Sequence, residues 1–144
     1  MLPLIVYVGS SFLLHLLWEN LHGPLYLVGT TPPDTQRLLF ATATGDMIFM
    51  LVIFAVLAML HRDWLWVSKK TSYAKISTWI VAIAIGVLLG TSFELWAVHI
   101  DHRWTYAEAM PIIPVLGIGL SPVLQMVVVP VAVLAITSMI TRRR

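Results

Sequence analysis

Two acidic side chains inside apolar segments are the residues of this chain most suited to chemistry. Asp46 stands in the middle of one long apolar run, and Glu94 stands near the end of another. At a rise of about 1.5 Å per residue, Asp46 lies roughly 14 Å beyond Arg37, and Glu94 lies about 9 Å before Ile100. An ionised carboxylate at the centre of a membrane-spanning helix costs about 2.5–3.5 kcal/mol. We therefore expect both groups to be protonated, paired, hydrated or bound to a cation within a functional site.

Other polar residues follow helical spacing and are predicted to join the same site. His15, Glu19 and His22 fall at i, i+4 and i+7, which places them on one stripe of a helix. Gln125 lies near the middle of the last apolar segment. The predicted catalytic residues are Glu19, Asp46, Glu94, Arg103 and Gln125. We expect His15 in the wall of this pocket, and His22, His99 and His102 at its mouth.

A stripe of small residues leads to Glu94. Gly86, Gly90 and Glu94 recur every four residues along the third apolar segment. Small residues at this spacing let a neighbouring membrane helix approach closely. Because Glu94 continues the same face, we expect its side chain to point into the protein and away from lipid.

The first hypothesis for function is acid/base chemistry on a lipophilic small molecule. Carboxyl groups in different surroundings can divide the work, one protonated as the acid and one ionised as the base. We assign the acid to Asp46, the deepest group, and the base to Glu94 or Glu19. This arrangement suits isomerisation or cyclisation, with an isoprenoid as one candidate substrate, and requires no cofactor. Aromatic residues that could line the site and face a cationic intermediate are Trp18, Tyr26, Trp96, Trp104 and Tyr106.

A transition-metal or haem site is the alternative hypothesis. Imidazole and carboxylate groups suit zinc, iron or copper, and helical bundles hold such ions between facing helices. The candidate ligands are His15, Glu19, His22, Glu94, His99 and His102. A regular helix turns His99 about 140° away from Glu94, at roughly 100° per residue. Binding one ion through both would therefore require the helix to unwind between them.

Transport or an accessory role is the third hypothesis. Membrane carboxylates and histidines form proton and cation paths, and a homo-oligomer could supply a pore at its axis. Most of the acidic and histidine residues gather in one half of the apolar segments and the adjoining loops. A complete path would also need polar groups in the other half, where the segments offer little beyond Ser77, Thr78, Thr137 and Ser138.

Four apolar segments must position these groups, and composition indicates what surrounds them. Of 144 residues, 59% are hydrophobic and 11% charged, whereas a soluble domain has about 25% charged residues. We therefore predict an all-α integral membrane four-helix bundle, a single transmembrane domain over residues 1–144 in a lipid bilayer. The expected spans are approximately residues 2–18, 38–60, 76–100 and 112–140.

Basic residues predict the orientation of these spans. Lys and Arg concentrate in the cytoplasmic loops of membrane proteins. The connection between the second and third segments and the C-terminal tail carry most of them, whereas Arg37 and Arg103 lie on the other side. We therefore predict a multi-pass plasma or inner membrane protein with both termini cytoplasmic and a pocket that opens outwards. The net charge of +2 gives no indication of nucleic-acid binding, and the lack of cysteine excludes thiolate ligands and nucleophiles.

Overall fold

The computed structural model describes residues 1–27 and 36–143, and its main elements are helices. The α-helices in these ranges are α1 (Leu2–His22), α2 (Gln36–His61), α3 (Lys70–Ala74), α4 (Ile76–His99) and α5 (Leu120–Arg142). Short 3₁₀ helices cover Gly23–Leu25 and Trp66–Ser68. Four segments, from α1, α2, α4 and α5, are long and apolar enough to cross a membrane. The side chains of residues 36–41, including Arg37, lie outside the description.

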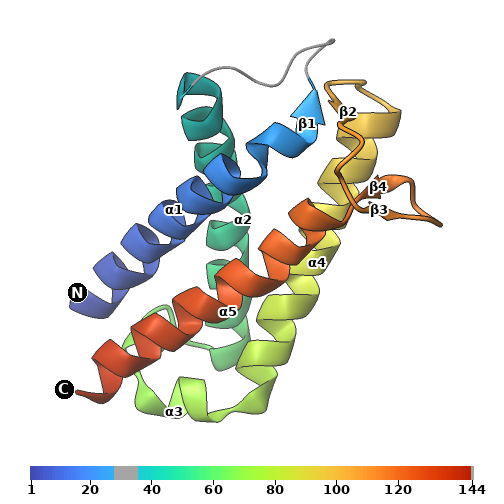
Figure 1. The fold of residues 1–144 in the computed structure, drawn as a ribbon. Coiled ribbons are helices and arrows are strands. Elements are labelled where there is room, and N and C mark those ends of the chain that lie inside the picture. Colours follow the sequence, from blue (N-terminus) through green and yellow to red (C-terminus); the bar gives the residue numbers. More distant parts are fainter. Residues whose placement is uncertain (28–35, 144) are drawn as a thin grey trace.

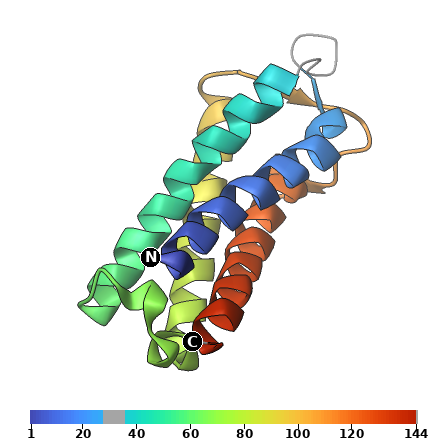
Figure 2. The same cartoon turned by 90° about the vertical axis from the view of Figure 1, so that its left-hand side faces the viewer.

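The four long helices run alongside one another as a bundle (Figures 1 and 2). α1 packs against α2 and α5, and α5 also packs against α4. Both termini and α3 lie at one end, which we call the terminal end (Figure 1). The strands lie toward the other end, which we call the loop end. The prediction of an all-α arrangement with four long apolar helices is confirmed, with α3 as an additional short helix.

Two pairs of very short antiparallel strands join the helices at the loop end. The pairs are β1 (Tyr26–Leu27) with β2 (Thr105–Tyr106), and β3 (Ile112–Ile113) with β4 (Ile118–Gly119). The prediction that the fourth span begins near Ile112 is wrong, because α5 begins at Leu120. Pro114 lacks a backbone donor, and Gly117 adopts a positive φ of 65°, so both residues favour a turn over a helix.

The first helix is longer than predicted, and this extension matters for the site. α1 continues past the expected end at Trp18 to His22, and the chain then turns at Gly23. His15, Glu19 and His22 therefore lie on one helix and are all buried. The predicted stripe of polar residues on this helix is confirmed.

Gly86 and Gly90 bring α4 close to α5, as the spacing predicted. A Cβ atom at Gly86 would overlap the backbone carbonyl of Met126, and one at Gly90 would lie 2.7 Å from Met126 Cγ. Carbon atoms do not approach so closely, so this packing requires glycine at both positions unless the helices shift. Glu94 continues the same face and is only 3% exposed.

The hydrophobic core fills the terminal half of the bundle. Its largest fully buried side chains include Trp66, Tyr7, Met50, Ile53 and Leu57. The ring of Tyr7 meets those of Phe54 and Trp66 with centroids 5.5 and 6.0 Å apart. Because Trp66 belongs to the connection between α2 and α3, this loop closes the terminal end of the core.

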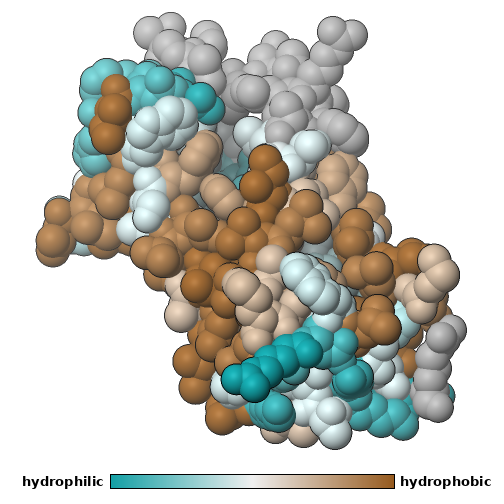
Figure 3. Space-filling model, turned by 180° about the vertical axis from the view of Figure 1, so that it is seen from behind, coloured by the Kyte–Doolittle hydropathy of each residue, from teal (hydrophilic) through white to brown (hydrophobic). Residues whose placement is uncertain are grey.

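The outside of the bundle is apolar around its middle. Figure 3 shows a hydrophobic band between hydrophilic ends, on the face that lies behind in Figure 1. Exposed apolar side chains of the long helices include Leu13, Ile48, Ile80 and Leu88. Such a surface is what a helical membrane protein presents to lipid.

Candidate functional site

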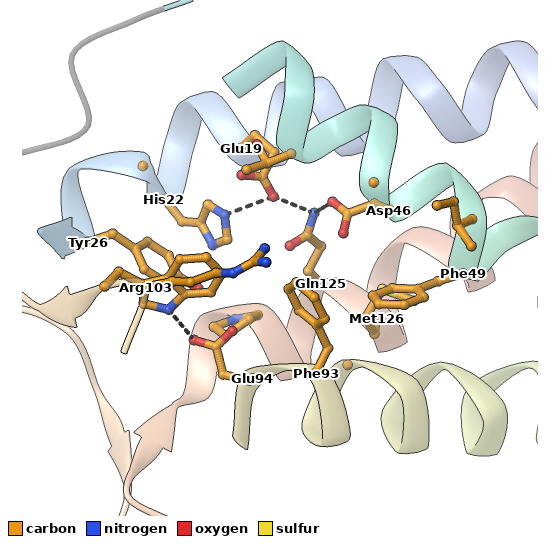
Figure 4. Close-up of a pocket in the computed structure, with 17 residues that line it drawn as sticks. Glu19, His22, Tyr26, Asp46, Phe49, Phe93, Glu94, Arg103, Gln125 and Met126 are labelled. Carbon is orange, nitrogen blue, oxygen red and sulfur yellow. Dashed lines mark hydrogen bonds and ion pairs between the residues drawn. The ribbon is translucent and has the colours of Figure 1, made fainter. Parts of the chain in front are cut away.

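A cavity of about 610 Å³ lies between α1, α2, α4 and α5 at the loop end (Figure 4). Small-molecule sites have volumes of about 300–1,000 Å³. The five residues predicted as catalytic line this cavity, namely Glu19, Asp46, Glu94, Arg103 and Gln125. In the described part of the chain, the other lining residues are His22, Gly23, Tyr26, Thr42, Gly45, Ile48, Phe49, Gly90, Phe93, Trp104, Pro122 and Met126.

The amide of Gln125 links two carboxyl groups in the cavity wall (Figure 4). Its Nε2 atom lies 2.9 Å from Asp46 Oδ2 and 3.1 Å from Glu19 Oε1. The three residues come from α5, α2 and α1, so this contact joins three helices. Gln125 is 3% exposed and Glu19 is 8% exposed, so the contact between them is buried.

His15 completes this polar group from within the protein. Its Nδ1 atom lies 2.9 Å from Gln125 Nε2 and 3.2 Å from Asp46 Oδ2. The amide nitrogen carries two hydrogens, which Asp46 and Glu19 can both accept. A proton on His15 Nδ1 can then be donated to Asp46. His15 is fully buried, and in the described part of the chain its Nε2 atom has no hydrogen-bond partner.

His22 continues the polar group toward the start of α5. Its Nε2 atom lies 3.2 Å from Glu19 Oε1, and its Nδ1 atom lies 3.0 Å from the hydroxyl of Ser121. The imidazole also meets the ring of Tyr26 edge-on, with centroids 5.1 Å apart. Polar contacts therefore continue without a break from the Gln125 amide to the Ser121 hydroxyl.

Glu94 lies on the opposite wall of the cavity (Figure 4). Its Oε1 atom accepts hydrogen bonds from the Tyr106 hydroxyl at 2.6 Å and from Trp104 Nε1 at 3.3 Å. Burial raises the pKa of the Tyr106 hydroxyl above its usual range, and the hydrogen bond to Glu94 raises it further. The phenol therefore stays protonated as a donor. One oxygen of Glu94 therefore accepts from two ring donors, whereas Asp46 and Glu19 both accept from the side-chain amide of Gln125.

The chain reverses directly after α4, which returns Trp104 to the cavity. His102 adopts a positive φ of 50°, a conformation common at helix ends. The amide of Arg103 donates to the carbonyl of Ala97 at 2.9 Å and fixes this reversal. Trp104 consequently lies beside Glu94, from which it is separated by more than two helical turns of sequence.

Aromatic rings form much of the remaining wall. The pairing of β1 with β2 places Tyr26 opposite Tyr106, with ring centroids 5.7 Å apart. Tyr26 also meets Trp104 edge-on at 5.6 Å. Farther along the cavity, Phe49 of α2 meets Phe93 of α4 at 5.7 Å. Such a wall suits a hydrocarbon chain, and its ring faces attract cations.

Arg103 lies at the edge of the cavity. Its Nε atom donates to the carboxylate of Asp101. Its guanidinium group lies over the ring of Trp96, 4.5 Å from the centroid. These two contacts hold a cation at the rim, while the carboxyl groups of Glu19 and Glu94 lie inside.

Two predicted residues of the pocket mouth lie elsewhere. His99 Nε2 bonds the carbonyl oxygen of Leu116 at 2.9 Å, and His102 Nδ1 bonds that of Val98 at 3.0 Å. Both histidines are exposed, and neither lines the cavity. The prediction for them is wrong because α4 stays regular to His99 and the chain then turns away.

The predicted metal ligands do not form one cluster. Across residues 1–27 and 36–143, no group of three or more His, Asp or Glu side chains is arranged to hold a metal ion. Glu94 lies across the cavity from Glu19, and His99 and His102 lie outside it. The geometry therefore does not favour the metal hypothesis.

The predicted aromatic residues divide into two groups. Tyr26 and Trp104 line the cavity, and Tyr106 contacts Glu94 behind it. Trp96 instead supports Arg103 and is 36% exposed. Trp18 packs against His22, with ring centroids 6.5 Å apart, and does not line the cavity.

Phe49, Phe93 and Met126 also line the cavity, although the sequence pattern did not predict them. Phe49 follows Asp46 at i+3, so helical spacing could have placed it on the same face. Phe93 directly precedes Glu94 on α4, and both side chains line the cavity. We find no signal in the sequence that identifies Met126, because its position depends on how closely α4 approaches α5.

No protein-family model matches this chain, and no curated protein or solved structure shows significant similarity to it.

Proposed function

We propose that this protein is an integral membrane enzyme that transfers protons to and from a lipophilic substrate, in an isomerisation or cyclisation reaction. The observation that supports this most strongly is the presence of carboxyl groups on facing walls of one cavity. Glu19 and Asp46 lie on one wall and Glu94 on the other. Substrate bound between them would have an acid and a base on opposite sides.

Asp46 is the proposed acid and Glu94 the proposed base. Asp46 donates a proton to one carbon of a double bond, which leaves a carbocation. Glu94 removes a proton from an adjacent carbon, so that a double bond forms one position away. No electrons are gained or lost overall, and a proton returns from Glu94 to Asp46 through water before the next cycle. In a cyclisation, a second double bond of the substrate attacks the cation before the proton is removed.

The surroundings of the carboxyl groups suit this chemistry. The rings of Tyr26, Phe93 and Trp104 would face the cationic intermediate and stabilise it. The contacts of His15 and Gln125 would hold the Asp46 carboxyl group in position. Isoprenoid lipids carry double bonds of the required kind, and the aromatic lining suits their apolar chains.

We further propose that the four long helices cross a membrane with the terminal end in the cytoplasm. Arg62, Lys69 and Lys70 lie in the connection at that end, and basic loops favour the cytoplasmic side. A protease-sensitive tag at the C-terminus should be protected in spheroplasts, whereas one inserted after Glu108 should be cleaved. Cleavage of the C-terminal tag alone would reverse the orientation.

The reaction can be tested without knowledge of the substrate. Purified protein in liposomes made from source-cell lipids is incubated in deuterated water, and the lipids are then analysed by mass spectrometry. Proton transfer should place deuterium in one lipid class. Asp46→Asn and Glu94→Gln should each slow the incorporation by about 100-fold or more, which is the usual contribution of a general acid or base.

Control variants separate this proposal from the metal hypothesis. Glu108 is an exposed acid, so Glu108→Gln should retain the full rate. His99→Ala and His102→Ala should also retain it. Loss of incorporation in the two histidine variants, with full rates in Asp46→Asn and Glu94→Gln, would reject the acid/base proposal.

A further inference from the structure

We infer that the substrate enters the cavity sideways from the bilayer, through an opening between α2 and α4. The substrate is then a lipid whose reactive group lies among the carboxyl groups and whose chain extends into the surrounding hydrocarbon. This inference rests on the proposed function for its chemistry. The route itself can be tested separately from any reaction.

Residues on α2 mark one edge of the opening. Gly45 and Ile48 line the cavity and are also exposed on the surface of the bundle. The side chain of Ile48 is 62% exposed. Both residues belong to Thr42–His61, a stretch apolar enough to lie in a membrane. The cavity therefore reaches the apolar side of the bundle within a predicted span.

Two phenylalanine rings lie across the same opening. Phe49 from α2 and Phe93 from α4 line the cavity and meet edge-on, with centroids 5.7 Å apart. Both side chains are only partly buried. Figure 4 shows them at one end of the cavity together with Met126. Rotation of either ring would widen the passage without moving a helix, and side chains of this kind rotate far faster than helices move.

The glycines in the two walls differ in a way that fits a passage on the α2 side. A Cβ at Gly90 would lie 2.7 Å from Met126 Cγ, so α4 is packed closely against α5 there. Among the atoms that the structure describes, a Cβ at Gly45 would meet none within 4 Å. The space beside Gly45 is therefore open to an apolar chain.

The described part of the loop end is more closely covered. β1 and β2 pair over this end of the cavity, and Tyr26 contacts both Trp104 and Tyr106. Backbone hydrogen bonds and ring contacts together therefore hold this cover in place. In the described part of the chain, the opening beside Gly45 is crossed by the ring contact between Phe49 and Phe93. A ring contact is easier to open than a strand pair, so we assign the route of the lipid to this opening.

Single-cysteine labelling can test this route, because the chain has no cysteine of its own. Met126 lines the cavity and is 2% exposed, so Met126→Cys places a thiol deep inside. Membrane vesicles are treated either with N-dodecylmaleimide, which dissolves in the bilayer, or with a sulfonated maleimide that stays in water. A thiol in apolar surroundings reacts slowly. Leu13 of α1 is 64% exposed, so Leu13→Cys serves as the reference for a thiol on the apolar surface.

A second substitution closes the proposed passage and has a matched control. Gly45→Leu would fill the open space beside the cavity. Gly9→Leu adds the same side chain to α1, at a position where a Cβ also meets no described atom within 4 Å. Gly9 does not line the cavity. Combined with Met126→Cys, Gly45→Leu should abolish labelling by N-dodecylmaleimide, and Gly9→Leu should leave it unchanged.

The expected result is labelling of Met126→Cys from the bilayer and not from water. Faster labelling by the sulfonated reagent, or equal effects of Gly45→Leu and Gly9→Leu, would overturn the inference. If Met126→Cys fails to fold, Thr42→Cys supplies a second cavity position. Failure of both folded variants to react, with Leu13→Cys labelled, would also reject the route.

The outcomes distinguish this inference from the proposed function. Labelling from the bilayer without deuterium incorporation would leave the lipid route standing and reject the enzyme. Deuterium incorporation combined with labelling only from water would keep the enzyme and reject the route.

Discussion

At the terminal end of the bundle, buried hydroxyl groups donate to backbone carbonyls, whereas polar side chains around the cavity bond to one another. The hydroxyl of Tyr73 donates to the carbonyl of Val67 at 2.8 Å, and that of Thr141 donates to the carbonyl of Thr137 at 2.9 Å. Around the cavity, Gln125 bonds two carboxyl groups, and Glu94 accepts from two ring donors. Buried polar groups therefore stabilise the fold at one end and form a candidate site at the other.

The two ends differ in whether the protons of their polar groups can be exchanged. A hydroxyl group has one proton, and donation to a helix carbonyl commits it to the fold. Carboxyl and imidazole groups around a cavity can take up or release protons, and a bound molecule can reach them. The buried polar groups of the terminal half therefore do not by themselves extend the site into a path across the bundle.

Packing also differs between the two ends, because the terminal half has a filled core and the loop half has a cavity. The terminal half surrounds Trp66, which is fully buried and whose Nε1 donates to the carbonyl of Phe54 at 3.2 Å. The loop half encloses a cavity of about 610 Å³. Stability should therefore depend more on the terminal end, and activity on the loop end.

The largest expected effect on stability is at Trp66. Trp66→Ala should lower the free energy of unfolding by about 3–5 kcal/mol, because it leaves a large void in the core. Trp64, which is 66% exposed, is the matched control, and Trp64→Ala should change stability by less than about 0.5 kcal/mol. Denaturant titration in detergent micelles measures both. If Trp66→Ala and Trp64→Ala lowered the free energy of unfolding equally, the proposed dependence of stability on the terminal core would be wrong.

Glycine substitutions should separate the two walls of the cavity. Gly90→Ala forces a Cβ against Met126 and should cost about 1–3 kcal/mol of stability. Gly45→Ala places a Cβ that meets no described atom within 4 Å, and it should stabilise the protein by up to about 1 kcal/mol, because alanine favours helix more than glycine does. The same unfolding titration tests the pair, and opposite signs are expected.

Two tyrosines offer a matched test of structure against activity. Tyr106→Phe should slow deuterium incorporation by roughly 10- to 100-fold, because a hydrogen bond to a charged group contributes about 1.5–3 kcal/mol. Tyr73→Phe should leave incorporation unchanged and lower stability by about 0.5–1.5 kcal/mol. If both variants lose activity equally, the division between the two ends is wrong.

The smallest effect concerns the surface of the terminal end. The ammonium group of Lys69 lowers the pKa of Asp63, and the amide of Leu65 lowers it further. A carboxyl group with a lowered pKa stabilises the fold above its unfolded pKa of about 4 and loses that contribution as the pH falls below it. The wild-type unfolding midpoint should fall slightly in this acidic range. Asp63→Asn should lack that part of the pH dependence.

Much of the fold could be predicted from local pattern. Apolar runs long enough for spans identified the four long helices, and the Gly86–Gly90–Glu94 spacing identified the face of α4 that packs inside. The predicted start of α5 was wrong because the residues from Ile112 onward are mostly apolar, like those of the helix itself. Pro114 and Gly117 nevertheless turn the chain there, so the helix begins only at Leu120. Hydrophobicity alone does not distinguish a strand pair from a helix when the residues on both are apolar.

The candidate site was predictable only in part, for a similar reason. Depth and helical face placed Asp46, Glu94 and Gln125 together, because both follow from sequence position within a span. The turn at His102 was not predictable from spacing, and it decides that Trp104 returns to the cavity while His102 does not.

By itself, the sequence determined that four long apolar helices form and which residues share a polar face, because helical periodicity fixes direction within one element. The tertiary structure alone decided that Gln125 bonds Asp46 and Glu19 while Glu94 faces them across a cavity. Those distances depend on how closely helices approach and where loops return. Both are set by contacts between residues far apart in the chain, such as Gly90 against Met126.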